Sequence, residues 1–202
     1  MLTTELLARP LLTLLFGYLM GSIPFGIILT RVAGAGDLRQ VGSGNIGATN
    51  VLRTGRKGLA ALTLLLDGLK GTAAVLLAAS SAPGNEGLAA VGALLGHLYP
   101  VWLRFRGGKG VATLAGIMAG LHWPSALVYA GVLLGTLGVS RYSSVAGMLA
   151  AISAPVAAAA LGRFDLTLLY LAFALLVLWK HRGNLERLMA GAEPRVGRSK
   201  DA

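Results

Sequence analysis

Charged residues are scarce in this 202-residue sequence: Asp, Glu, Lys and Arg together make up 13% of it, whereas soluble domains carry about 25%. Hydrophobic residues make up 55% of the chain, and they come in long blocks. So little polar surface cannot cover a soluble fold of this length in water. The composition therefore predicts an integral membrane protein, with the lipid bilayer as a partner.

Cysteine is absent, which excludes disulfides, thiolate metal sites and a cysteine nucleophile. The three histidines, His97, His122 and His181, lie far apart in the sequence, so the sequence predicts no metal site. Acidic residues are also few, and the formal net charge is +10. Nucleic-acid binding would need aromatic or helical readers on a soluble face. None is visible, so we expect no nucleic-acid partner.

The hydrophobic blocks predict an all-α integral membrane protein, a compact bundle of about seven transmembrane helices in a single polytopic domain, 1–202. A spanning helix needs about 20 residues, so block 110–122 is short: it is tilted, crosses a thin part of the bundle, or is re-entrant. If it and its neighbour do not span separately, the count falls to five. The first block lacks an A-x-A cleavage site and is interpreted as a retained helix. The blocks lie at about 10–30, 58–80, 87–103, 110–122, 124–140, 144–161 and 165–180, with a tail at 181–202.

Lys and Arg alternate between the connecting segments. They concentrate in 31–57, 104–109, at Arg141 and in the tail, whereas the segments between hold only Arg9 and Arg163. The positive-inside rule then predicts an external N-terminus and a cytoplasmic C-terminus.

The stretch GSGNIGATN at 42–50 formally matches the dinucleotide fingerprint G-x-G-x-x-G, but its flanks are predicted membrane helices, not a βαβ unit. Glycine-rich backbone can still converge its N–H groups on an anion, at the start of a helix that favours negative charge. The alternative is an ordinary polar turn. The residues that would contribute donors are Ser43, Asn45, Gly47 (through its backbone), Thr49, Asn50 and Arg53.

Two further polar stretches begin or end a predicted helix. In GGKGVAT at 107–113, Lys109 stands between glycines and can reach a phosphate; the alternative is a lysine that only sets topology. In HRGNLER at 181–187, His181 is a general base, an anion donor or a helix C-cap. All three stretches fall on the cytoplasmic side of the predicted topology.

Inside the blocks, Asp67 and Lys70 can pair at i, i+3, and a buried pair of this kind indicates a functional site or its support. His97 and Ser144 are two further polar candidates. The cytoplasmic corners would bring cationic side chains within reach of one another, and such a pocket at the lipid interface suits a phosphorylated substrate with an apolar part. These cations are Arg53, Lys109, Arg182 and Arg187.

Together these stretches resemble the bacterial acyl-phosphate:glycerol-3-phosphate acyltransferases, the PlsY family. The resemblance rests on SGNIGATNVLR at 43–53, GGKGVAT and HRGNLERL, and LLDGLKG at 65–71, GHLYPVW at 96–102 and RYSS at 141–144 fit it too. It covers essentially the whole chain, in order. It implies a multi-pass enzyme of the bacterial inner membrane, with its active site facing the cytoplasm. Such an enzyme transfers an acyl group from acyl phosphate to the sn-1 hydroxyl of glycerol 3-phosphate, the first acylation of phospholipid synthesis, without a cofactor.

For such a reaction we expect catalysis from Ser43, Arg53, Lys109 and His181. The 43–50 loop would hold acyl phosphate; glycerol 3-phosphate would be held by Arg53, Lys109, Ser144, His181 and Asn184, with support from Asp67, Lys70, His97 and Arg187. The base is either His181 or the substrate's own phosphate. We expect a monomer. The rival interpretations are a transporter of a phosphate-bearing solute, which predicts inverted repeats, and a non-catalytic lipid-binding subunit.

Overall fold

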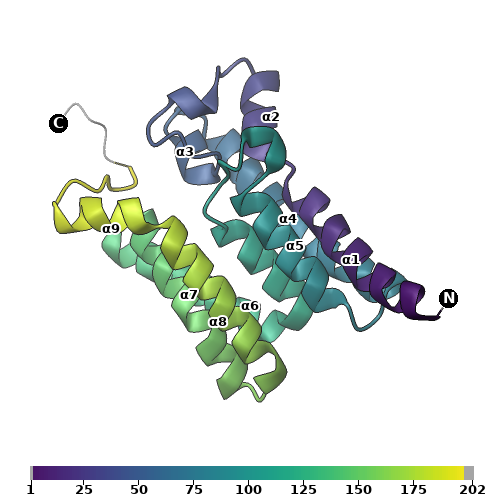
Figure 1. The fold of residues 1–202 in the computed structure, drawn as a ribbon. Helices are drawn as coiled ribbons and strands as arrows, with labels where there is room; N and C mark the ends of the chain where they lie inside the picture. The colour runs from purple at the N-terminus through teal and green to yellow at the C-terminus, as the bar shows by residue number, and fades with distance from the viewer. Residues whose placement is uncertain (1, 198–202) are drawn as a thin grey trace. The chain divides into compact units, whose positions relative to one another are not determined.

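The computed structural model describes residues 2–197, and the side chains of 8–197. Within residues 2–197 every regular element is helical, as the sequence predicts (Figure 1). Arg198 and Lys200, which contribute to the charge of the tail, lie outside the described residues. The elements are α1 (Leu2–Gly21), α2 (Phe25–Val32), η1 (Leu38–Gln40), α3 (Ala48–Leu52), α4 (Lys57–Ser81), α5 (Glu86–Leu98), η2 (Val101–Leu103), α6 (Val111–Ser140), α7 (Ser143–Ala160), α8 (Phe164–Lys180) and α9 (Arg182–Met189).

Four helical segments among the described residues are long and apolar enough to cross a membrane: Ala8–Val32, Lys57–Ser81, Val111–Ser140 and Ser143–Ala160. A fifth is added if α8 and α9, bent by 55° at their junction, count as one span. With 13 residues, α5 is shorter than such a span requires. The count of seven and the orientation of the termini therefore stay predictions.

A kink within α6 separates blocks 110–122 and 124–140, where the sequence predicts a break. His122 has non-helical dihedrals (φ −160°, ψ 90°), and its Nδ1 lies 2.8 Å from the hydroxyl of Ser125. Pro124 follows in the first turn beyond the kink, where a missing N–H breaks no helical hydrogen bond. The chain divides at this kink into two compact units, residues up to Leu121 and residues from His122.

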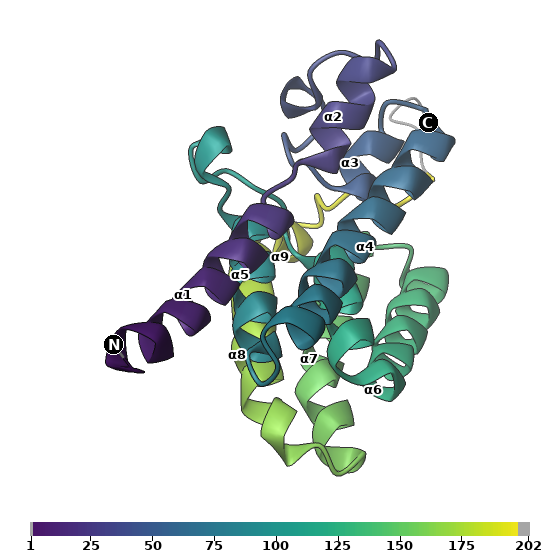
Figure 2. The ribbon, with the colours of Figure 1, turned by 90° about the vertical axis from the view of Figure 1, so that its right-hand side faces the viewer.

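In the first unit, α1 and α5 lie side by side (Figures 1 and 2). Their backbones touch through the small residues that the sequence spaces four apart. A Cβ added at Gly17 or Gly21 would overlap the backbone of α5, and one at Gly92 or Gly96 would overlap that of α1. These two pairs of glycines therefore let α1 and α5 pack closely.

In the second unit, α7 packs against α8. Ala146, Ala150 and Ala154 of α7 are completely buried, and such small residues let helices approach closely. Large apolar side chains, among them Leu168 and Trp179, remain exposed on α8, as expected for a surface that faces lipid.

Candidate active site

The polar loop that carries GSGNIGATN is fixed to the first unit by three apolar side chains. Leu38, Ile46 and Val51 are 0%, 2% and 0% exposed, and Leu38 and Val51 cluster with Ala60 in the first turn of α4. Ser43, Thr49 and Arg53 stay exposed. The loop is therefore a built structure that presents polar groups outward from an apolar base.

Asn50 holds this loop together from within. Its Nδ2 donates to the carbonyls of Leu38 (3.0 Å) and Val41 (2.9 Å). Its Oδ1 accepts from the backbone N–H of Ser43 and from Nη1 of Arg53, both at 3.3 Å. Asn50 is 2% exposed, and both the oxygen and the nitrogen of its side-chain amide bond to the loop itself. It thereby fixes the backbone at Ser43 and the guanidinium of Arg53.

The turn before α3 depends on glycine conformation and on a second asparagine. Gly42 and Gly44 have φ of +54° and +68°, a region that glycine enters at no steric cost. Oδ1 of Asn45 accepts the N–H of Gly47 at 2.9 Å. As the sequence predicts, the loop enters a helix, α3, but this helix has only five residues, and Gly55, with φ +80°, redirects the chain before α4. A helix this short adds little dipole, so the donors of the loop itself carry any anion binding.

The second loop places Lys109 two residues before α6, as the sequence predicts. The N–H of Gly107 donates to Leu98 O (3.2 Å) and that of Gly108 to His97 O (3.0 Å), so the loop lies flat against the end of α5. Neither glycine has room for a Cβ. Lys109 itself is half-buried.

Asp67 and Lys70 form the ion pair that their spacing predicts, with Nζ 2.7 Å from Oδ1 and both side chains almost fully buried. Lys70 Nζ also donates to the carbonyl of Ile23 (2.8 Å), between α1 and α2. His97 Nδ1 lies 3.8 Å from the same Asp67 oxygen. The sequence gives no sign that the other edge of the His97 ring abuts Gly108, because that contact depends on how the loop folds back.

In the second unit, His181 ends α8 and is 2% exposed. Its Nδ1 lies 2.8 Å from the carbonyl of Val177. A carbonyl only accepts, so Nδ1 carries the proton, and the neutral ring has its lone pair on Nε2. The C-cap interpretation and the base interpretation are therefore compatible. The neighbouring Arg182 is exposed, with its guanidinium 4.9 Å from the ring centroid of Trp179.

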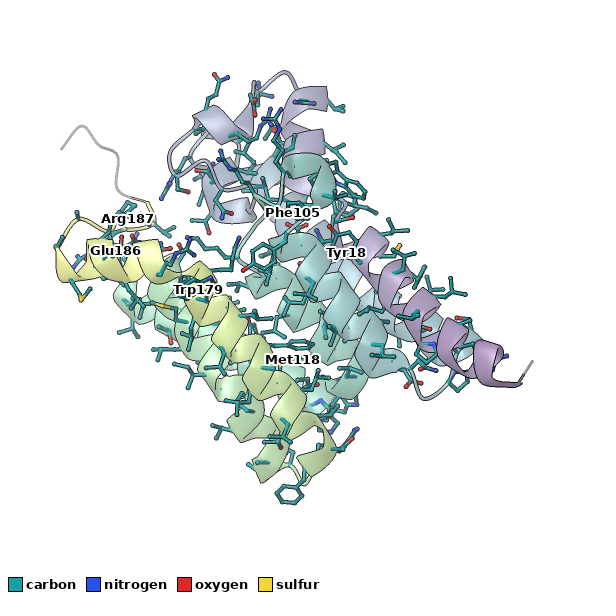
Figure 3. The ribbon with its side chains drawn as sticks, in the orientation of Figure 1. Tyr18, Phe105, Met118, Trp179, Glu186 and Arg187 are labelled. Carbon is teal, nitrogen blue, oxygen red and sulfur yellow. The ribbon has the colours of Figure 1, made fainter. Side chains whose placement is uncertain are left out.

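Two further predicted site residues of this unit, Asn184 and Arg187, bond to Glu193. Glu193 is not among the site residues that the sequence predicts. Glu193 accepts from Asn184 Nδ2 (2.6 Å) and from Nε of Arg187 (2.8 Å; Arg187 is labelled on α9 in Figure 3). Burial alone would raise the pKa of Glu193, but the polar groups of Ser144, Asn184 and Arg187 around the carboxylate together hold that pKa below its ordinary value. Of these three, Asn184 and Arg187 make the close hydrogen bonds. The one sequence signal was an acidic residue between Arg187 and Arg195 of the basic tail.

The predicted site residues thus fall into two groups, each ordered within its own unit. The first unit brings Ser43, Asn50 and Arg53 together in one loop and places Lys109 in another. The second unit gathers Ser144, Asn184 and Arg187 around one carboxylate, with His181 three residues from Asn184. Both groups are rich in hydrogen-bond donors and cations, which suits phosphate-bearing ligands.

Known proteins with similar sequences or structures share one description. The family model described as glycerol-3-phosphate acyltransferase matches residues 11–191. Proteins of that name from Novosphingobium aromaticivorans and Mesorhizobium japonicum are 62% and 56% identical to this chain over 190 and 187 residues, covering 94% and 93% of it and 96% of each relative.

The fold matches a solved membrane enzyme. The crystal structure of PlsY (YgiH), an integral membrane glycerol 3-phosphate acyltransferase, in its glycerol 3-phosphate form, is similar with a TM-score of 0.87 and 38% identity over 93% of this chain and 96% of that one. Its lysophosphatidic acid form gives 0.85 and 36% identity, over 93% and 95%. By sequence along nearly its whole length, and by fold, this chain is an enzyme of the glycerol-3-phosphate acyltransferase family.

Proposed function

We propose that this enzyme transfers the acyl group of acyl phosphate to the sn-1 hydroxyl of glycerol 3-phosphate. The hydroxyl oxygen attacks the acyl carbon, the bond from that carbon to the phosphate oxygen breaks, and lysophosphatidic acid and inorganic phosphate leave. The solved relative is described with glycerol 3-phosphate and with lysophosphatidic acid, an acceptor and a product of this reaction. The observation that carries the proposal is the 42–53 loop, in which Asn50 orders backbone donors and Arg53 for an anion.

Acyl phosphate is a mixed anhydride and already has a good leaving group. Catalysis then needs only placement of the hydroxyl against the carbonyl and stabilisation of developing negative charge. Backbone N–H groups of the loop with Ser43, Asn45 and Thr49 would hold the acyl phosphate. Asn50 supports this loop as a framework residue, because its donors are engaged by loop carbonyls.

Glycerol 3-phosphate is assigned to the cations and donors that remain. These are Arg53, Lys109, Ser144, His181 and Asn184, and Lys109 is long enough to neutralise charge on both phosphates. Asp67, Lys70, His97 and Arg187 support these residues through the ion pairs and contacts described above.

The proton of the attacking hydroxyl goes to Nε2 of His181 or to a phosphate oxygen of the substrate. The hydrogen bond from Nδ1 to Val177 keeps the lone pair on Nε2, which supports the histidine as base. A His181→Gln variant distinguishes between these two candidate bases. Turnover that falls by at least about 100-fold, the usual scale of general-base catalysis, supports His181, whereas near-normal turnover at neutral pH identifies the phosphate.

The donor is tested by reconstituting purified protein with labelled glycerol 3-phosphate and offering palmitoyl phosphate, palmitoyl-CoA or palmitoyl-acyl carrier protein separately. Labelled lysophosphatidic acid from palmitoyl phosphate alone is the expected result. Product from another donor would overturn the choice of acyl phosphate. No product from any donor, in protein shown to be folded, would favour the transporter, which liposome uptake then tests.

We place the enzyme in the bacterial inner membrane as a monomer with its active site toward the cytoplasm. The absence of cysteine allows a clean topology test. Gln40→Cys and Ser81→Cys put thiols at exposed positions on opposite predicted sides. A maleimide that cannot cross membranes should label Ser81→Cys in intact spheroplasts and Gln40→Cys only after permeabilisation; the reverse pattern would contradict the orientation.

A further inference from the structure

A polar cluster is buried within the first unit, where α1, α4 and α5 come together. Asp67 and Lys70 of α4 pair at 2.7 Å, Lys70 donates to Ile23 O at 2.8 Å, and His97 of α5 lies 3.8 Å from Asp67. The three side chains are 1–4% exposed. Desolvating three ionisable groups is costly unless they are paired, so a cluster retained here calls for a reason beyond stability.

The His97 ring links this cluster to the glycine loop. One edge, Nδ1, faces Asp67. The other edge fills the space where a side chain at residue 108 would begin: a Cβ added there would overlap Nε2 and lie 2.7 Å from Cε1, whereas ordinary contact starts at 3.4 Å. The backbone N–H of Gly108 also bonds to the His97 carbonyl at 3.0 Å. The position of the ring therefore sets how closely the loop lies against α5.

The same stretch of α4 also seats the helix that follows the loop. A Cβ added at Gly68 would lie 3.6 Å from Ala112 O, and one added at Gly71 would lie 3.1 Å from Ile117 N. Both contacts are to the first turns of α6. Segment 67–71 therefore acts on the chain both before and after Lys109. Its charged residues act on the loop through His97, and its glycines pack against α6.

We propose that Asp67, Lys70 and His97 form a positioning cluster for the proposed acyl transfer. The buried ion pair fixes the position of the His97 ring, and the ring fixes the backbone of residues 107–110. The Lys109 ammonium is thereby placed to contact the substrate phosphate. This inference rests on the proposed function of Lys109. None of the three side chains is assigned a contact with substrate; each acts through the loop.

Reciprocal size changes at the ring and at the glycine provide the test. Gly108→Ala adds a methyl group against the ring, and His97→Ala removes the ring that it would meet. Each single variant should lower kcat/KM for glycerol 3-phosphate by roughly 10- to 100-fold, because misplacing a contact group by about 1 Å costs on that scale. The double variant should have a kcat/KM about tenfold higher than that of Gly108→Ala, since the added methyl group then enters the space that the ring has left.

Leu94→Ala is the matched control, because it also empties a fully buried site on α5 but one turn away from the loop contact. It should lower the melting temperature to a similar extent as His97→Ala and leave the KM for glycerol 3-phosphate unchanged. Losses that multiply in the double variant, or equal kinetic effects of His97→Ala and Leu94→Ala, would overturn the proposal.

A conservative variant covers the case in which His97→Ala does not fold. His97→Gln keeps bulk and a donor at this position, so it should retain more affinity for glycerol 3-phosphate than Gly108→Ala does; a loss as large as that of Gly108→Ala contradicts the proposal. The wild-type transfer assay separates the two levels of inference. An inactive wild type contradicts the proposed function, whereas an active wild type with kinetically silent His97 variants contradicts only the positioning cluster.

Discussion

Replacing Asn50 by alanine tests whether the polar loop is an ordered binding structure. The change removes two donors that satisfy the carbonyls of Leu38 and Val41, at 3.0 and 2.9 Å. It also removes the acceptor for the N–H of Ser43 and for Nη1 of Arg53. The apolar contacts of Leu38 and Val51 are left in place, so the effect is confined to the order of the loop.

The expected loss follows from the two shorter bonds. A carbonyl left without its partner costs about 1–3 kcal/mol, so two of them destabilise the ordered loop by roughly 2–6 kcal/mol. At about 1.4 kcal/mol per factor of ten, even the lower figure reduces the ratio of ordered to disordered loop by roughly 30-fold. Asn50→Asp keeps the shape of the side chain but places an oxygen opposite both carbonyls, so we expect it to destabilise the ordered loop at least as much.

The assay compares kcat/KM for acyl phosphate with hydrogen exchange of a peptide covering residues 40–54, measured without substrate. Both Asn50 variants should exchange faster in this peptide, and kcat/KM should fall by up to about 30-fold, because it follows the fraction of molecules whose loop is ordered. Asn85→Ala, which removes a weaker 3.4 Å bond to Ala82 O within the turn between α4 and α5, is the control and should match wild type. A folded Asn50→Ala protein with unchanged exchange in this peptide would refute the framework role.

Three further outcomes are expected. Lys109→Ala should abolish turnover in protein that remains folded, which activity and thermal unfolding measure on the same sample; retained activity would remove Lys109 from the site. Gly92→Ala should destabilise the protein by about 1–3 kcal/mol, because its methyl group overlaps the backbone of α1, whereas Gly131→Ala, with no described neighbour within 4 Å, should not. Because the pKa of Glu193 is lowered in the folded protein, its stabilisation is complete above its ordinary value of 4.5 and is lost as the pH falls through the lower folded value. Glu193→Gln should therefore melt below wild type at pH 7, with a gap that closes in acid; a gap independent of pH would contradict the assignment.

The helical class of the fold follows from composition alone, because a chain this apolar must satisfy its backbone hydrogen bonds within helices. Local spacing also predicts the Asp67–Lys70 pair and the close contact at Gly92 and Gly96, since both depend on which residues share a helix face. The donors of the 43–53 loop and Lys109 could be named for the same reason: the residue types themselves carry the chemistry of phosphate binding.

Span lengths were less predictable, because hydropathy marks apolar blocks but does not say where a helix bends. The non-helical dihedrals of His122 bend the chain between two blocks, and the turn at Gly55 limits the helix after the polar loop to five residues. Both outcomes depend on backbone dihedrals at single residues, which a pattern of apolar and polar letters does not encode.

The sequence by itself determined that this is a helical membrane protein of the glycerol-3-phosphate acyltransferase family, and it predicts which residues bind phosphate. Only the tertiary structure decided how those residues are held. Asn50 bonds to carbonyls up to 12 residues earlier, His97 meets Gly108 where the chain folds back after α5, and Glu193 gathers Asn184 and Arg187. Each contact joins residues whose approach depends on turns and helix packing, and no local periodicity specifies such an approach.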